Sequence, residues 1–350
     1  MCQLLKIIQP KVFLEFLNKL NFLFKIEFKR KNSLNYKNLV MTDRVKERED
    51  IPNFDKIEVS TKTIIGVSNL NIEIEKLFEN LPVVDYVVIP KKRGRKKKVE
   101  DVNPNKDIAP GSIITLKWQD SLRGVDLKQK NNKKSTGTSK YFRNALTIVM
   151  YLEPNKLINF KISKNGKFQF TGPKHHYHAE LAIKYFWDYI RDDIKSSYTI
   201  VDKDGKFRVT FITVMTNIDF NLGFLVNREN LDKYINKFTE YNSLLETSFG
   251  YTGVNIKFPM SDKIDMDLKK ITWEDNEFKK STVKYTDYLE NLSEKDKDKE
   301  NHKQRYNTFL VFQSGNVIMS GLVRPYMKNI YYDFFNIINR CKNDIEEKIR

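Results

Sequence analysis

The stretch Lys164-Asn165-Gly166-Lys167-Phe168-Gln169-Phe170-Thr171-Gly172 occurs twice in this chain. The second copy, Gln313-Ser314-Gly315-Asn316-Val317-Ile318-Met319-Ser320-Gly321, begins 149 residues later. Each copy follows a strand-like run and precedes a long helical pattern. Asn165-Gly166 is a strong hairpin signal, because both residues accept the positive φ that two-residue hairpin loops need. The predicted unit is therefore strand, tight turn, strand, helix, present twice.

The repeat extends upstream to two asparagine-bearing strands, Val67–Ile72 and Met215–Phe220, which begin 148 residues apart. The spacing from asparagine to hydroxyl is also kept: 102 residues separate Asn69 from Thr171, and 103 separate Asn217 from Ser320. A repeat in sequence usually means a repeat in structure, and two copies indicate a pseudo-twofold molecule, because solenoids need more.

Length and charge narrow the class of protein. A chain of 350 residues fits one or two domains. Its net charge of +17 favours a polyanionic partner, nucleic acid ahead of an anionic membrane, although a soluble protein rich in lysine has the same composition. The two cysteines stand near opposite ends and predict neither a disulfide framework nor a cysteine-based zinc site, which indicates an intracellular protein. No apolar run has the length of a membrane span, so no membrane partner is expected.

Three segments interrupt or precede the repeats. Residues 1–56 are expected to form a flexible N-terminal extension. A basic insertion at about 90–140 contains Lys91–Lys98, with seven cations in eight residues. That run fits a solvated loop, a phosphate-contacting arm or a nuclear localisation signal. A charged insertion at about 262–304 ends in Ser293–Arg305, which is expected to be disordered because it is almost wholly charged.

The two repeats are expected at residues 57–194 and 207–342. Each closes with a helix, at about 175–194 and 325–342, whose apolar residues recur at spacings of three and four. Antiparallel hairpins with helices gathered on one face make an α+β layer structure. The other face of the sheet must then meet solvent or a ligand.

This pattern resembles the TATA-box-binding protein family. The second half is the closer match: Tyr241-Asn242-Ser243 leads through Phe249-Gly250-Tyr251 to Pro259, and Phe309–Gly315 follows in the family's order. The resemblance implies two repeats that form a curved, saddle-shaped antiparallel sheet with helices on the convex face. It also implies that the concave face lies on the DNA minor groove and that phenylalanines at its ends kink the duplex.

The resemblance implies a set of DNA-binding residues. The minor groove offers mainly acceptors, so a reader of A·T pairs needs short neutral donors at its centre. Asn69 and Asn217 fit that role, one in each half, with Thr171 and Ser320 as small hydroxyl neighbours. Cations expected to meet phosphates, where they would set the salt dependence of binding, are Lys167, Lys174 and Arg324.

The wedge positions match the family in the second half only. Phe249 lies ten residues before Pro259, and Phe312 lies three before Gly315. The corresponding first-half residues, Asn144 and Ser163, cannot enter a base step. Two neighbours that a small shift of register would bring in are Phe142 and Phe160. Without such a shift, the protein would kink DNA at one end or bind it differently.

Catalytic chemistry is not expected. His175-His176-Tyr177-His178 has no cysteine nearby and starts a helix, so exposed polar residues explain it better than a metal site. Asp265 and Asp267 lie in an insertion and are expected to be solvated. We therefore predict no catalytic or metal-binding residue and no cofactor.

The leading hypothesis is a divergent, viral TATA-box-binding-protein-like initiation factor that binds and bends A·T-rich promoter DNA. The resemblance implies a transcription factor IIB-like protein and RNA polymerase as partners. The expected location is the nucleus or a viral replication site, with packaging in the virion as a further option. The alternative is a packaging protein that uses the same fold without sequence preference, which sequence-blind binding would favour.

Overall fold

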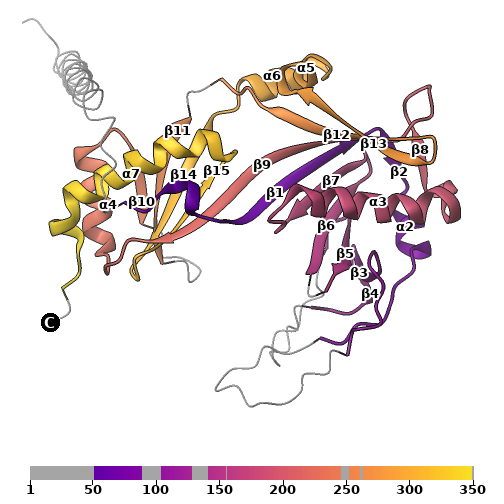
Figure 1. The fold of residues 1–350 in the computed structure, drawn as a ribbon, viewed down its shortest axis with the longest axis horizontal. Coiled ribbons are helices and arrows are strands. Elements are labelled where there is room, and N and C mark those ends of the chain that lie inside the picture. The colour runs from indigo at the N-terminus through magenta and orange to yellow at the C-terminus, as the bar shows by residue number, and fades with distance from the viewer. Residues whose placement is uncertain are drawn as a thin grey trace, which may run out of the picture.

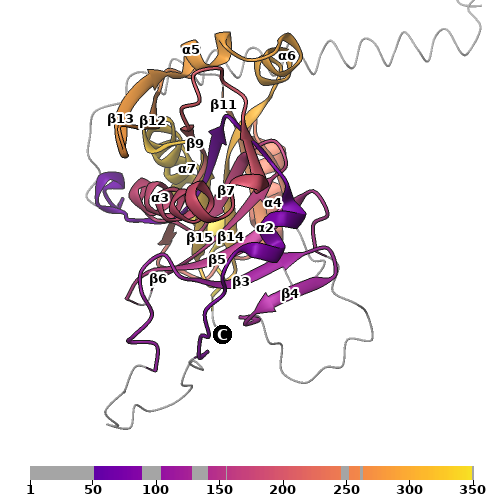
Figure 2. The same cartoon turned by 90° about the vertical axis from the view of Figure 1, so that its right-hand side faces the viewer.

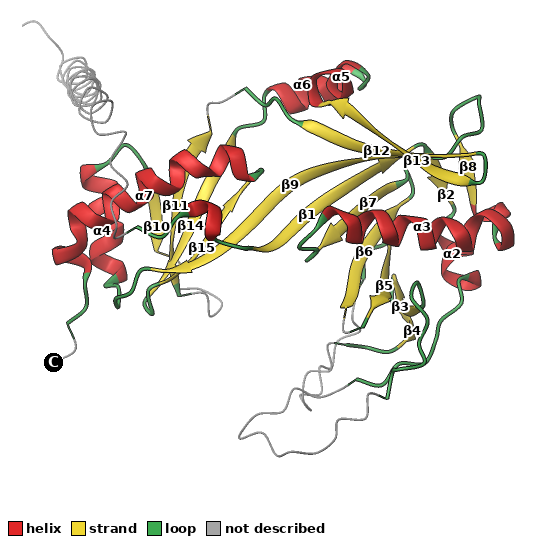
Figure 3. Ribbon diagram, viewed as in Figure 1, coloured by secondary structure: helices red, strands yellow, loops and turns green. Residues whose placement is uncertain are grey.

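The computed structural model describes residues 51–88, 104–127, 141–154, 156–245, 252–260 and 263–348. It has an α+β fold: one large sheet whose described strand pairs are antiparallel, with helices packed against it (Figures 1 and 3). The predicted α+β class is therefore confirmed. The basic run Lys91–Lys98, residues 1–50 and Phe249 lie outside the described residues.

Two long strands, β1 (Val59–Ser68) and β9 (Arg208–Asn221), pair at the middle of the sheet. The order outward from β1 is β7, β6, β5, β3 and β4, and the order outward from β9 is β15, β14, β11 and β10. Their bounds are Lys167–Thr171 (β7), Lys156–Ser163 (β6), Ala145–Glu153 (β5), Ile113–Trp118 (β3), Ser121–Gly124 (β4), Asn316–Gly321 (β15), Arg305–Phe312 (β14), Gly253–Met260 (β11) and Asn242–Leu245 (β10). A separate pair joins β2 (Leu70–Ile72) to β8 (Tyr198–Ile200).

Helices follow the strands in the same sequence in both halves of the chain. The short helix α2 (Ile74–Asn80) comes after β1 and β2, and α4 (Arg228–Phe238) comes after β9. The long helices α3 (His176–Asp193) and α7 (Arg324–Ile345) come after β7 and β15. Figure 2 shows α3 and α7 on one side of the strands. The helices predicted at 175–194 and 325–342 are thus confirmed to within a few residues at each end.

The two hairpins that define the repeat form as predicted. Gly166 and Gly315 adopt φ of 67° and 79° at the β6–β7 and β14–β15 turns. A Cβ atom at Gly166 would lie 2.3 Å from the Leu70 carbonyl oxygen, and one at Gly315 would lie 2.2 Å from that of Phe224. Glycine is required at both turns, because any side chain would be strained and would collide with backbone.

Each half has its own hydrophobic core between sheet and helix. In the first half, Phe160 and Phe168 pack edge-on against Phe186 of α3. In the second, Phe309 stacks on Phe334 of α7 with ring centroids 4.1 Å apart. Because strands alternate their side chains, this packing commits one face of each strand to the helices.

The charged insertion is ordered and crosses to the other half. Strand β12 (Asp267–Glu274) pairs with β9 and with β13 (Glu277–Lys284), and Trp273 contacts Trp187 of α3. Two helices follow, α5 (Tyr285–Glu290) and α6 (Glu294–Asn301). The prediction of disorder over Ser293–Arg305 is wrong for α6, because the Ser293 side chain caps it and ion pairs at i,i+3 support it.

Part of the predicted flexible extension also packs. Residues 51–57, which we call the N-terminal strap, include a short 3-10 helix (Phe54–Lys56) and lie on α7. Phe54 is 1% exposed, and its ring centroid lies 5.2 Å from that of Tyr331. The strap and the insertion hairpin therefore each attach one half of the chain to the other.

Candidate nucleic-acid interface

The sheet has one face that the long helices leave uncovered. On β7, Phe168 and Phe170 are buried, whereas Lys167, Gln169 and Thr171 are exposed on the opposite side. The same alternation runs through the other inner strands. The open face, as we name this surface, consists near its middle of Thr63 and Ile65 (β1), Met215, Asn217 and Asp219 (β9), Lys167, Gln169 and Thr171 (β7), and Asn316, Ile318 and Ser320 (β15).

Strand register fixes which residues correspond between the halves. Ser320 is paired with Asn217 across β15 and β9, and Thr171 is paired with Thr63 across β7 and β1. Thr171 and Ser320 therefore occupy matching positions on the open face, as their spacing in sequence suggested. The residue that matches Asn217 is Thr63.

Asn217 lies at the middle of the open face, opposite Thr61 of β1. Its side-chain Oδ1 is buried without a hydrogen-bond partner, and no hydrogen bond of the described residues uses its Nδ2. The strand holds the Asn217 side chain in place without a hydrogen bond to its amide group. Leaving a buried amide oxygen unpaired costs free energy. The Asn217 amide is a candidate donor to a ligand on this face.

Asn69 has a different environment, which corrects its predicted equivalence to Asn217. It follows the last residue of β1, and its Nδ2 donates to Asp202 Oδ2 at 2.7 Å and to the Lys206 carbonyl at 2.8 Å. Its Oδ1 accepts from the Arg208 backbone N–H at 2.9 Å. Asn69 therefore fixes the entry to β9, and its donors are already used.

The three predicted phosphate-contacting cations have different surroundings. Lys167 is exposed at the start of β7 on the open face, and Lys174 is exposed in the connection from β7 to α3. Arg324, at the start of α7, donates to the carbonyls of Ile57 and Phe54 at 2.6 and 2.7 Å. Since its guanidinium is used by the strap on the helix-covered side, the expectation of a phosphate contact is corrected for Arg324.

Phenylalanines stand at both ends of the open face. Phe312 ends β14 on the side opposite the buried Val311 and is partly exposed. In the first half Phe160 is fully buried, which excludes it as a wedge, whereas Phe142 is 61% exposed just before β5. Lys161 Nζ lies 3.8 Å from the centre of the Phe142 ring. Phe142 is two residues from the position that the family pattern indicated. Its contact with Lys161, which alternates on β6 with the buried Phe160 and Ile162, places its ring at the open face.

The outer parts of the open face differ between the halves. In the first half, Val149 and Tyr151 of β5 are buried under a cluster to which Tyr86, Ile108 and Leu127 contribute. In the second half, the outer strands leave apolar and basic side chains in solvent: Leu244, Lys257 and Tyr306. The accessible face is therefore longer on the second half.

Two residues of the histidine run, Tyr177 and His178, contact Glu153. His178 Nε2 lies 3.1 Å from Glu153 Oε1, and the Tyr177 hydroxyl donates to the same oxygen at 3.1 Å. The hydrogen bond with His178, followed by that with Tyr177, holds the pKa of the Glu153 carboxyl below its usual value. In the insertion, Asp267 forms an ion pair with Lys284. In the described part of the chain, no three histidine, cysteine or carboxylate residues are arranged to hold a metal ion.

The chain is similar in sequence to a viral protein and in structure to a solved TBP. No family model matches the sequence. The chain is 25% identical over 314 residues to uncharacterized protein 335L of Invertebrate iridescent virus 6, covering 84% of this chain and 88% of that protein. A solved structure of Methanococcus jannaschii TBP aligns with 83% of this chain and 99% of its own length, at 13% identity and a TM-score of 0.40. Among the described helices, none is long and apolar enough to span a membrane.

Proposed function

We propose that this chain is a TATA-box-binding-protein-like factor that binds A·T-rich DNA through its open face and bends it. The strand order outward from β1 matches the order outward from β9 over four strands, which supports a pseudo-twofold, saddle-shaped sheet. The observation that carries the proposal is the open face itself: among the residues named at its middle, one lysine (Lys167) and one aspartate (Asp219) sum to zero charge, in a chain of net charge +17.

The composition of that middle suits a minor groove lined with acceptors. Asn217, Ser320, Thr63 and Thr171 supply amide and hydroxyl donors, and the aliphatic Ile65 would contact sugar edges. A·T pairs present acceptors without the guanine amino group, so neutral donors at the centre favour them. The surrounding cations would meet phosphates and supply affinity that falls with salt.

Bending needs apolar side chains at the ends of the contact. Phe142 and Phe312 are the two phenylalanines that combine an open-face position with solvent access in the described part of the chain. Insertion of such a ring between base pairs costs a few kcal/mol of unstacking, which the added contact with bent DNA offsets. We assign the wedge role to these two residues, together with Phe249, whose position follows from the sequence alone.

The wider role rests on the resemblance to the family. We propose transcription initiation, with a transcription factor IIB-like protein and RNA polymerase as partners and the nucleus or a viral replication site as location. Binding requires no cofactor and no catalytic step.

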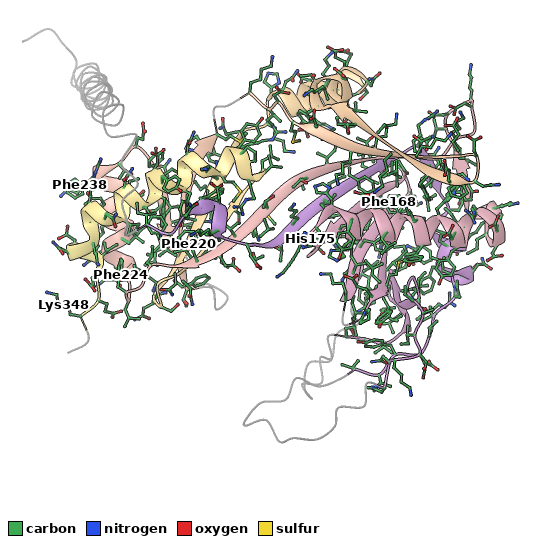
Figure 4. All side chains as sticks on the ribbon, viewed as in Figure 1. Phe168, His175, Phe220, Phe224, Phe238 and Lys348 are labelled. Carbon is green, nitrogen blue, oxygen red and sulfur yellow. The ribbon has the colours of Figure 1, made fainter. Side chains whose placement is uncertain are left out.

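The direct test measures binding and end-to-end fluorescence transfer on a short duplex. An A·T-rich TATA-type site is compared with a scrambled site at several salt concentrations, for wild type and for Phe142→Ala/Phe312→Ala. Phe238→Ala is the matched control, because Phe238 is 62% exposed but ends α4, away from the open face (Figure 4). We expect preferential binding with bending, lost in the double variant alone.

A sequence-blind packaging protein is the second candidate. Asn69 is used internally and Thr63 stands opposite Thr171, so only one of the two predicted amides lies on the open face. Equal, salt-sensitive affinity for both duplexes without bending, indifferent to the phenylalanine variants, would favour packaging and contradict the initiation-factor proposal.

A further inference from the structure

On the helix-covered side of the sheet, a polar region lies between the two hydrophobic cores, and we call it the seam. At this seam the inward side chains are polar: Thr213 and Thr216 of β9 are 4% and 1% exposed, and Lys62 of β1 is partly buried. The long helices α3 and α7 both begin here, α3 after β7 in the first half and α7 after β15 in the second, and Figure 4 labels His175 at the start of α3. Neither hydrophobic core fills this region.

The seam holds more positive than negative charge. Lys62 is close enough to Lys269 and Arg324 that both lower the pKa of its ammonium group, in addition to the larger effect of burial. Arg324 is occupied by strap carbonyls. Lys269 lies 3.2 Å from Glu180, which also pairs with Lys280 at 2.9 Å. Glu180 is therefore already shared by two lysines.

Lys62 itself has no acceptor for its ammonium group among the described residues. No hydrogen bond or ion pair to Lys62 Nζ is formed within that part of the chain, and its contacts with Gly172 and Pro173 are made by backbone atoms. A partly buried cation between two others is costly unless an anion compensates it. Such a cost is common at sites that bind a ligand.

His176 adds an unused polar atom to the same seam. Its Nε2 lies 2.8 Å from Thr213 Oγ1, and its Nδ1 is buried without a partner. When the Thr213 hydroxyl donates to Nε2, the neutral ring carries its proton on Nδ1 and offers a free donor. His175 precedes the helix without a side-chain cap, so the first backbone N–H groups of α3 are not satisfied by that residue.

We propose that this seam is a binding site for a phosphate-class oxyanion, held by Lys62, Lys269 and His176. The donors come from both halves of the chain, because Lys62 and His176 belong to the first half and Lys269 to the insertion of the second. A tetrahedral anion has several acceptor oxygens that point in different directions, so it can accept hydrogen bonds from donors on different elements. A carboxylate has two oxygens in one plane and can accept from fewer of them. Its binding would connect the halves at the side opposite the open face.

The test follows thermal unfolding of the full chain without DNA, in chloride, acetate or inorganic phosphate at matched ionic strength. We expect phosphate at about ten times its Kd to raise Tm by about 2 °C beyond acetate. Lys62→Gln should abolish this increment and raise Tm in chloride, because it removes an uncompensated charge. Lys233→Gln on α4, an exposed lysine far along the chain from the seam, should keep the increment.

Calorimetric titration with inorganic phosphate supplies a second measurement for Lys62→Gln and Lys269→Gln. We expect binding of wild type and at least a tenfold loss of affinity in each variant. Equal effects of phosphate and acetate, or an unchanged phosphate effect in Lys62→Gln, would overturn the site. DNA affinity of Lys62→Gln should stay unchanged, since Lys62 lies on the covered side, so this result is independent of the proposed function.

Discussion

Asn217 and Ser320 face each other directly across strands β9 and β15. The matching pair in the first half is Thr63 and Thr171, so the open face carries an amide on one side of its middle and a hydroxyl on the other. An amide can donate two hydrogen bonds and a hydroxyl one. If the face binds DNA, its two halves read the duplex with unequal strength, which would give the complex a preferred direction.

The first prediction separates the two asparagines. Asn217→Ala should lower affinity for an A·T-rich duplex about tenfold while leaving the scrambled duplex little affected, because it removes a base-edge donor worth about 1–3 kcal/mol. Asn69→Ala should instead lower the free energy of unfolding by about 1–2 kcal/mol through loss of its contacts with Asp202, Lys206 and Arg208. Fluorescence anisotropy and chemical denaturation measure the two effects. A reversal of these roles would contradict the register assignment.

The second prediction concerns the first-half wedge. Phe142→Ala should reduce bending at one end of the duplex and lower affinity, with little change in the free energy of unfolding, because its side chain is mostly in solvent. Phe160→Ala should instead lower the free energy of unfolding by about 3–5 kcal/mol, because Phe160 is fully buried. Fluorescence transfer on duplexes labelled at either end, combined with denaturation, distinguishes them. Unchanged bending in Phe142→Ala would remove it from the site.

The third prediction tests the N-terminal strap. Phe54→Ala should lower the free energy of unfolding by about 3 kcal/mol or more, because the ring is buried against Tyr331 and lies under the Arg324 guanidinium. The matched control is Asp55→Ala, whose ion pair with Lys328 is exposed and should contribute less than about 1 kcal/mol. Urea denaturation measures both. Equal effects would mean that the strap is not part of the cooperative fold.

The repeat could be predicted because it depends on local chemistry. Gly166 and Gly315 mark turns that only glycine tolerates, and the apolar periods of α3 and α7 set which face they bury. The partners of Asn69 and Arg324 could not be predicted, because they come from residues more than one hundred positions away in the chain. The spacing of a family motif does not fix a wedge position either, because only the folded structure shows that Phe142 is exposed and Phe160 is buried.

The order in the insertion shows a second limit. Charge density alone indicated disorder over Ser293–Arg305, but α6 forms with a serine cap and short-range ion pairs, between α5 and β14. The β12–β13 hairpin is held by Ile271 and Trp273. These two residues belong to the second half of the chain but pack in the hydrophobic core of the first half. Tertiary contacts of this kind override local propensity, and a pattern read one segment at a time does not contain them.

The last prediction is a loss of stability in mild acid that depends on His176. Burial, with added repulsion from Lys62 and Lys269, lowers the pKa of this imidazole to about 4, against 6.5 for the free side chain. Between these values the unfolded chain binds a proton that the folded chain does not, so stability falls as pH decreases from about 6.5 to about 4. By pH 4.5 the contribution is on the order of 2 kcal/mol.

In His176→Gln this part of the pH dependence should disappear, whatever the variant's stability at pH 7.5. The control is His302→Gln, which changes an exposed histidine after α6 and should keep the pH dependence. Urea denaturation at half-unit steps of pH measures the slope, and parallel slopes for His176→Gln and wild type would show that His176 is not the buried neutral group that the seam requires.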